Sequence, residues 1–253
     1  MTARRHAHFD RIALPVLLAV LVTAPARAGE ALTELLRAEF EAQAVGEPIG
    51  TGGAAIGEPV SWTMGNRVVE FGITGQGLEL QDTGVSTAVS MRFEFLDDRE
   101  MTTGMLSISV WLEVQVLDSF YIRLRENGSS TTDYGQVILT PLGALRLDDE
   151  TGDMGDVAPA GSIQAGNVHR IEWVHDLDAG THSLYLDGAP LVEDRVNGQD
   201  GGVDGRGIGA VLFGFLSDAN TDGVIEIDTL EVYSDVVPRG DPVFNDGFEQ
   251  AEG

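Results

Sequence analysis

The chain has 253 residues, 41 acidic side chains against 15 basic ones, and a net charge of −26 at neutral pH. All basic residues are arginine, and a surface so acidic repels the phosphates of nucleic acids and anionic lipids, which excludes both as partners. Cysteine is absent, so no disulfide framework exists and the fold must be stabilised by a buried core.

The first 28 residues have the features of a secretory signal peptide. Arg4, Arg5 and Arg11 form a basic start, residues 12–22 form an apolar run, and Ala26-Arg27-Ala28 offers a cleavage site. The apolar run is too short to span a bilayer, which takes about 20 residues. We therefore expect cleavage near Ala28, secretion to the periplasm or the exterior, and no membrane span.

Alternation of apolar and polar residues dominates after position 29 and predicts strands. The opening stretch 36–42 follows this period, although its Ala, Leu and Glu content leaves a short helix as the alternative. Two acidic or glycine-rich stretches, 148–165 and 197–209, are expected to be loops. Further strands are expected at 67–73, 77–81, 88–95, 105–116, 120–125, 136–140, 144–147, 168–175, 183–187, 210–216 and 224–233. So many short strands without a convincing amphipathic helix predict an all-β, two-sheet antiparallel sandwich.

The segment 166–188 is the most informative part of the chain. Its first strand alternates Ile171 and Trp173 with Arg170, Glu172 and Val174. The whole segment, after a second strand, ends in the turn pair Asp187-Gly188. This hairpin resembles that of the concanavalin A-like (laminin-G-like) jelly-roll families. The resemblance implies one jelly-roll domain over residues 29–236, followed by a tail over 237–253.

The strands expected at 105–116 and 120–125 offer a candidate ligand-binding surface. If a three-residue loop joins them as a hairpin, matching of their apolar faces pairs Glu113 with Arg123 and Trp111 with Arg125. Tyr121 then lies on the same polar face, where an aromatic ring can stack on a sugar. The alternative is that an arginine or a loop covers Trp111.

A calcium site is suggested by the segment Asp218-Ala-Asn-Thr-Asp-Gly-Val-Ile225. Asp218, Asn220 and Asp222 stand at positions 1, 3 and 5 of an EF-hand-like loop, and Glu226 can contribute from position 9. The acid expected at position 12 is missing, since Thr229 stands there. An ordinary turn between two strands is the alternative.

The segment Glu226-Ile-Asp-Thr-Leu-Glu231 resembles the E-x-D-x-x-E signature of family 16 glycoside hydrolases. That resemblance implies a nucleophile at Glu226, an electrostatic partner at Asp228 and an acid/base at Glu231, in a retaining mechanism. The apolar positions shift phase by one between Ile227 and Leu230, as a β-bulge would cause. The alternative is a structural last strand, because few residues follow it.

Three classes of function remain open. A non-catalytic, lectin-like module for a polysaccharide or glycoconjugate is the first, and an adhesive or structural matrix protein is the second. A β-glycan-cleaving enzyme is the third. The tail carries Phe244-Asn-Asp-Gly-Phe-Glu249, which resembles an ending of many secreted proteobacterial proteins. Neither its role nor the oligomeric state follows from the sequence.

Overall fold

The computed structural model describes nine stretches of the chain: 32–49, 59–62, 65–71, 75–82, 89–126, 133–148, 154–197, 207–216 and 222–235. The predicted signal peptide over 1–28 and the tail over 237–253 lie outside these residues. Within them, no helix is both long and apolar enough to cross a membrane.

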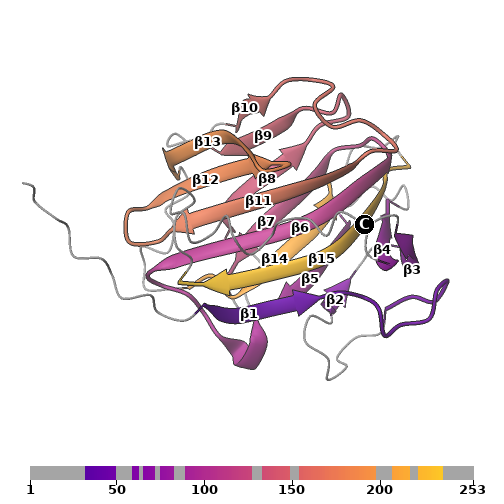
Figure 1. Ribbon diagram of the computed structural model, residues 1–253, viewed down its shortest axis with the longest axis horizontal. Helices are drawn as coiled ribbons and strands as arrows, with labels where there is room; N and C mark the ends of the chain where they lie inside the picture. Colours follow the sequence, from indigo (N-terminus) through magenta and orange to yellow (C-terminus); the bar gives the residue numbers. More distant parts are fainter. Residues whose placement is uncertain are drawn as a thin grey trace, which may run out of the picture. The chain divides into compact units, whose positions relative to one another are not determined.

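The described residues form two antiparallel sheets, which Figure 1 shows lying one behind the other. Sheet A has the strand order β13-β12-β11-β6-β15-β4-β3, with β1 also paired to β15. Its strands are β1 (Thr33–Ala38), β3 (Gly65–Phe71), β4 (Gly75–Gln81), β6 (Met105–Val116), β11 (Val168–Asp176), β12 (Thr181–Leu186), β13 (Ala189–Val196) and β15 (Val224–Ser234).

Sheet B has the order β10-β9-β8-β7-β14-β5-β2. Its strands are β2 (Pro59–Trp62), β5 (Val89–Glu94), β7 (Phe120–Arg125), β8 (Asp133–Leu139), β9 (Leu145–Asp148), β10 (Met154–Ala158) and β14 (Ala210–Phe215). One short 3-10 helix, η1 (Leu96–Asp98), follows β5.

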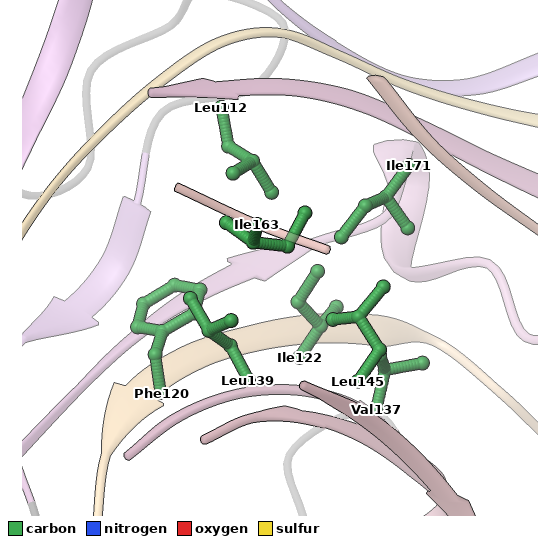
Figure 2. Close-up of a pocket in the computed structure, with 8 residues that line it drawn as sticks. All are labelled: Leu112, Phe120, Ile122, Val137, Leu139, Leu145, Ile163 and Ile171. Carbon is green, nitrogen blue, oxygen red and sulfur yellow. The ribbon is translucent and has the colours of Figure 1, made fainter. Parts of the chain in front are cut away.

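The core lies between the sheets and is built from the alternate apolar residues that the sequence marks. Phe93, Phe120, Phe213 and Phe215 of sheet B are almost fully buried, with ring centroids 5.2 to 6.1 Å apart along the chain of contacts. Figure 2 shows apolar side chains of both sheets pointing toward one another. The gap between them has a volume of about 10 Å³, which is no more than one water molecule needs. This part of the interior is closely packed and offers no room for a ligand.

The predicted two-sheet antiparallel jelly-roll sandwich is confirmed. The opening segment is a strand and not a helix, but it ends at Ala38 because Phe40 adopts a positive φ of 59° and turns the chain. Three strands were not predicted: β2, β10 and β13. Of these, β10 lies inside the expected loop 148–165.

The expected hairpin between residues 105–116 and 120–125 was wrong, although the bounds of both strands are correct. Strand β6 pairs with β11 and β15 in sheet A, whereas β7 pairs with β14 and β8 in sheet B. Residues 117–119 thus cross from one sheet to the other, and Asp118 is fully buried at the crossing. The apolar faces of the two strands do meet, but across the core and not side by side.

Strand β15 is the centre of sheet A. One edge pairs with β6 throughout, while the other pairs first with β4 and then with β1. The register shifts between Asp228 and Glu231, where Thr229 has a positive φ of 45°. This is the β-bulge that the sequence predicted, and it lies where β1 replaces β4.

Candidate functional site

The outer face of sheet A carries a continuous polar surface around Trp111. On β6 the inward residues Val110 and Leu112 are buried in the core, so the alternate position Trp111 points outward and is half-buried. Its neighbours in register are Arg170 on β11 and Asp228 on β15. The Arg170 guanidinium lies over the indole ring, 5.9 Å from its centroid. An arginine therefore lies over Trp111, as the alternative from the sequence expected, but it is Arg170 and not Arg125.

Arg170 connects three side chains of this surface. Its Nε donates to Ser109 Oγ at 2.9 Å, and its guanidinium lies 4.0 Å from the Glu172 carboxylate. Glu172 and Ser109 face each other on adjacent strands and are both buried. These contacts fix the guanidinium beside the indole ring.

Three glutamates form a row across the sheet on one side of Trp111. Glu226 on β15 lies between Glu79 on β4 and Glu113 on β6. Arg67 on β3 holds Glu79 with two hydrogen bonds of 2.7 and 2.8 Å. Burial, and then the charge of Glu113, raise the pKa of Glu226, while a hydrogen bond from Gln115 opposes this shift. We call the surface formed by Ser109, Trp111, Glu113, Arg170, Glu172, Glu226, Asp228 and Glu231 the Trp111 face.

The bulge in β15 places all three acids of the E-x-D-x-x-E segment on the Trp111 face. Glu226, Asp228 and Glu231 are opposite Glu113, Trp111 and Ser109 of β6 respectively. The partners of the two glutamates are four residues apart, so their Cα atoms are separated by roughly 13 Å along the strand. A retaining glycosidase holds its two carboxyl groups ~5–5.5 Å apart. Both glutamate side chains would have to converge over Trp111 to reach that separation.

Asp228 is the most unusual acid of this face. Its side chain is 1 % exposed, and its Oδ2 has no hydrogen-bond partner. Burial raises the pKa of Asp228 to about 6, with smaller contributions from Glu41 and Glu39, although hydrogen bonds from Thr229 oppose the shift. Near neutral pH this carboxyl group can therefore exchange a proton.

Glu231 and Tyr233 close the other side of the face. The Tyr233 hydroxyl lies 3.4 Å from carboxylate oxygens of both Glu231 and Glu34, and Arg37 lies 4.0 Å from Glu231. Burial and the two carboxylates raise the pKa of Tyr233 to about 12. This corner is held together by its own polar contacts.

The structure divides the predicted ligand-binding residues between opposite sides of the sandwich. Trp111 and Glu113 lie on the outer face of sheet A, whereas Tyr121, Arg123 and Arg125 lie on the outer face of sheet B. Tyr121 is buried against Ala210 and Leu212, and the Arg123 guanidinium stacks 4.0 Å from its ring centroid. The predicted single surface was wrong for the same reason as the hairpin, because the chain crosses between sheets after Val116.

The predicted calcium loop cannot be compared residue by residue. Asp218 and Asn220 lie outside the described residues, Asp222 is exposed, and Glu226 belongs to the Trp111 face. Among the described residues, no group of three or more acidic or histidine side chains is arranged to hold a metal ion. Calcium binding by this loop stays a prediction.

Several residues of the Trp111 face were not singled out from the sequence. Arg170 and Glu172 were placed on the polar side of their strand, but nothing in the sequence showed that β11 lies beside β6. Glu79 and Arg67, which adjoin the face beside Glu226, had no motif around them. The sequence showed that these side chains point outward from their strands. Which outward side chains are neighbours depends on the order of the strands in the sheet, and the sequence did not give that order.

Comparison with family models finds no match, and neither does comparison with curated proteins. Solved structures do match. The fold is shared with the family 7 polysaccharide lyase alginate lyase A1-II′, at 13% identity and a TM-score of 0.50, over 67% of this chain and 84% of the lyase. The binding domain of botulinum neurotoxin serotype G aligns at 14% identity and a TM-score of 0.52, over 81% of this chain. The match spans about half (49%) of that neurotoxin chain.

A third solved structure, the cellulose-induced protein Cip1, aligns at 13% identity and a TM-score of 0.49, over 78% of this chain and 96% of Cip1. At identities this low, the alginate lyase and neurotoxin matches show a shared fold and nothing about activity, because one fold hosts many activities.

Proposed function

We propose that the protein is a secreted, non-catalytic carbohydrate-binding module whose ligand lies across the Trp111 face. The observation that carries this proposal is the position of Trp111, half-buried on the outer face of a sheet between a fixed guanidinium and a carboxyl group. An indole ring can stack on the C–H face of a sugar, and flanking Arg, Glu and Ser side chains can bond its hydroxyl groups.

The charge of this face indicates which polysaccharides fit. Glu113, Glu226, Asp228, Glu231 and Glu172 outnumber Arg170, the one cation among the residues that define the face. A polyanionic chain is disfavoured there because like charges repel. An uncharged or cationic polysaccharide is favoured. The alginate lyase gives a precedent for a polysaccharide ligand on this fold, but this face is better suited to a different class of polymer.

The test is a calorimetric titration of the wild type and of Trp111→Ala with an uncharged β-glucan such as laminarin, and the affinities of the two proteins are compared. Loss of an indole stacking surface should weaken binding about tenfold, since such contacts contribute on the order of 1 kcal/mol beyond area burial. Leu142→Ala is the matched control, because Leu142 is 73% exposed in the turn between β8 and β9, in the other sheet. Equal affinities of wild type and Trp111→Ala for every glycan tested would leave the adhesive or structural role as the better explanation.

A second candidate function is a family 16-like hydrolase that uses Glu226, Asp228 and Glu231. The specific observation in its favour is that the bulge does bring the three acids onto one face beside an aromatic ring. The raised pKa of Glu226 counts against it, because the resemblance makes Glu226 the nucleophile and a nucleophile must be ionised. The wide separation of Glu226 and Glu231 along β15 makes non-catalytic binding the better proposal.

A further inference from the structure

A second concavity lies on the same outer face of sheet A, towards its β13 edge. Its volume is about 130 Å³, and it is formed by β6, β11, β12 and β13. At roughly 30 Å³ per water molecule, a space of this size holds about four waters, which is on the order of one pyranose ring. The residues that define the Trp111 face do not line it.

A β-bulge in β13 creates the concavity. His182 pairs with Arg195 and Leu184 with Val192, so Glu193 and Asp194 together oppose the single residue Ser183. Asp194 takes a positive φ of 50°, and its backbone N–H donates to Ser183 Oγ at 3.0 Å. The bulge therefore adds one residue to β13, and both acidic residues at the bulge line the concavity.

The lining combines the groups that a sugar ring requires. Val174 and Met105 supply apolar surface, while Thr181, Ser183 and Tyr185 supply hydroxyl groups. Asp176, Glu193 and Asp194 supply carboxylates, and the lining contains no arginine. Its one basic side chain is His182, which is almost fully buried. Asp176 uses its Oδ1 to accept two backbone hydrogen bonds, which fixes its orientation.

We propose that this concavity, the β13 pocket, binds one pyranose residue that carries a protonated amino group, as in a glucosamine-containing polysaccharide. Three carboxylates in a lining without arginine favour a ligand that brings donors and positive charge, and an ammonium group supplies both. The hydroxyl groups of the ring then meet Thr181, Ser183 and Tyr185, and its C–H face meets Val174.

This inference rests on the proposed function, because the β13 pocket would be a subsite for the polymer held at Trp111. Glu172 links the two places, since it lies opposite Tyr185 on one side and Ser109 on the other. Strand spacing and rise put the Tyr185 and Trp111 positions roughly 12 Å apart. One oligosaccharide of a few residues can therefore occupy both.

The experiment compares a glucosamine tetramer with its N-acetylated counterpart at pH 6 and physiological salt, by calorimetry. The wild type should bind the amino form about tenfold more tightly, because charge-assisted hydrogen bonds are lost on acetylation. The double variant Glu193→Gln/Asp194→Asn should lose most of that preference while it keeps its affinity for the N-acetylated form. Glu47 is an exposed acid of the segment after β1. Glu47→Gln controls for the loss of negative charge and should keep the preference for the amino form.

Three other outcomes overturn the inference. An unchanged preference in the double variant shows that the β13 pocket does not recognise the amine, and the proposed function still stands if Trp111→Ala weakens both tetramers. If Trp111→Ala weakens neither, the proposed function itself fails. Calcium binding by the wild type that the double variant abolishes would assign the carboxylates to a metal ion instead.

Discussion

Trp111 and Asp228 occupy facing positions on β6 and β15, so an indole ring stands beside a carboxyl group that is almost fully buried. In the bulge that follows Asp228, Thr229 has a positive φ, and its backbone N–H donates to Asp228 Oδ1 at 2.6 Å. Oδ2 has no such partner. The most solvent-shielded acid of the Trp111 face therefore adjoins the ring that we propose as the sugar platform.

Asp228→Asn should stabilise the protein at alkaline pH. The folded-state pKa of about 6 lies above the ordinary value of 3.8, so the folded state favours the protonated form. Ionisation of Asp228 therefore lowers the free energy of unfolding. This loss is absent below pH ~4 and complete above pH ~6, where it reaches about 3 kcal/mol. The variant keeps the Oδ1 acceptor for Thr229 but has no charge to bury.

Urea unfolding of both proteins at pH 8 and at pH 4 checks this. The variant should gain up to about 3 kcal/mol in the free energy of unfolding at pH 8 and little at pH 4. An equal change at both pH values would show that packing and not ionisation determines the effect.

His175→Gln should make the protein less sensitive to acid. His175 is 2 % exposed and lies 4.5 Å from the Trp173 ring, with His182 at 5.5 Å. Burial, and then the charge of His182, lower the pKa of His175 well below 6.5. A depressed folded-state pKa gives stability that is present above pH 6.5 and lost below it, because the unfolded chain binds the proton more readily.

The loss from this one histidine amounts to about 1.4 kcal/mol between pH 7.5 and pH 5.5. The measurement is the difference between these pH values in the free energy of unfolding, which should be smaller in the variant by that amount. The variant can be less stable at both values without affecting the comparison. The same pH dependence in both proteins would contradict the prediction.

Gly143→Ala should destabilise the turn between β8 and β9 strongly. Gly143 has a φ of +73°, and a Cβ there would lie 2.1 Å from the Ile163 carbonyl oxygen. Strain and steric overlap together should lower the free energy of unfolding by about 3 kcal/mol. Gly161→Ala is the control, because Gly161 has a similar φ of +84° but open space around its Cβ. Gly161→Ala should lower the free energy of unfolding by about 1 kcal/mol. Equal losses of stability in the two variants, measured by urea unfolding, would show that the chain relieves the steric contact at position 143.

Arg170→Ala should weaken glycan binding, whereas Arg123→Ala should leave it unchanged. Arg170 lies over Trp111 on sheet A, and Arg123 lies over Tyr121 on the outer face of sheet B. We expect about a tenfold loss for Arg170→Ala, from the lost cation–π contact and hydrogen bonding. Calorimetric titration of both variants with the same glucan checks this. A comparable loss in Arg123→Ala would move the binding surface to sheet B.

The wild type should release no reducing ends from laminarin or agarose. Glu226 and Glu231 are too far apart along β15 for direct partnership in a retaining mechanism. A reducing-sugar assay on the wild type, with Glu226→Gln and Glu231→Gln purified in parallel, decides the matter. Activity in the wild type that both substitutions abolish would establish the hydrolase.

The sequence predicted most strands because alternation records which face of each strand is buried. The bounds of β6 and β7 were correct for this reason, and the phase shift between Ile227 and Leu230 located the bulge in β15. Alternation does not record which strands are neighbours. A hairpin and a crossing between sheets bury the same faces of β6 and β7, so the two could not be distinguished.

The missed strands have little alternation to detect. Strand β13 lies at the edge of sheet A and is mostly exposed, with Glu193 and Asp194 in a bulge. Strand β10 is short and lies at the edge of sheet B, where Arg146 of β9 pairs with Asp156 at 2.7 Å. Edge strands bury one side weakly, so their sequences resemble loops. The β13 pocket was invisible for the same reason, since its acids belong to an unrecognised strand.

The central place of β15 has a consequence for how the chain reaches its native state. Among the described strands, β15 alone connects β1 to the rest of sheet A, and it alone connects the pair β3 and β4. In sequence, β15 is the last strand of the sheet. Thr33 and Ser234 are partners across almost the whole described chain. Such long-range pairing makes the closing of this sheet a late and slow event, and intermediates that lack β15 would expose the unpaired edges of β1, β4 and β6 to aggregation.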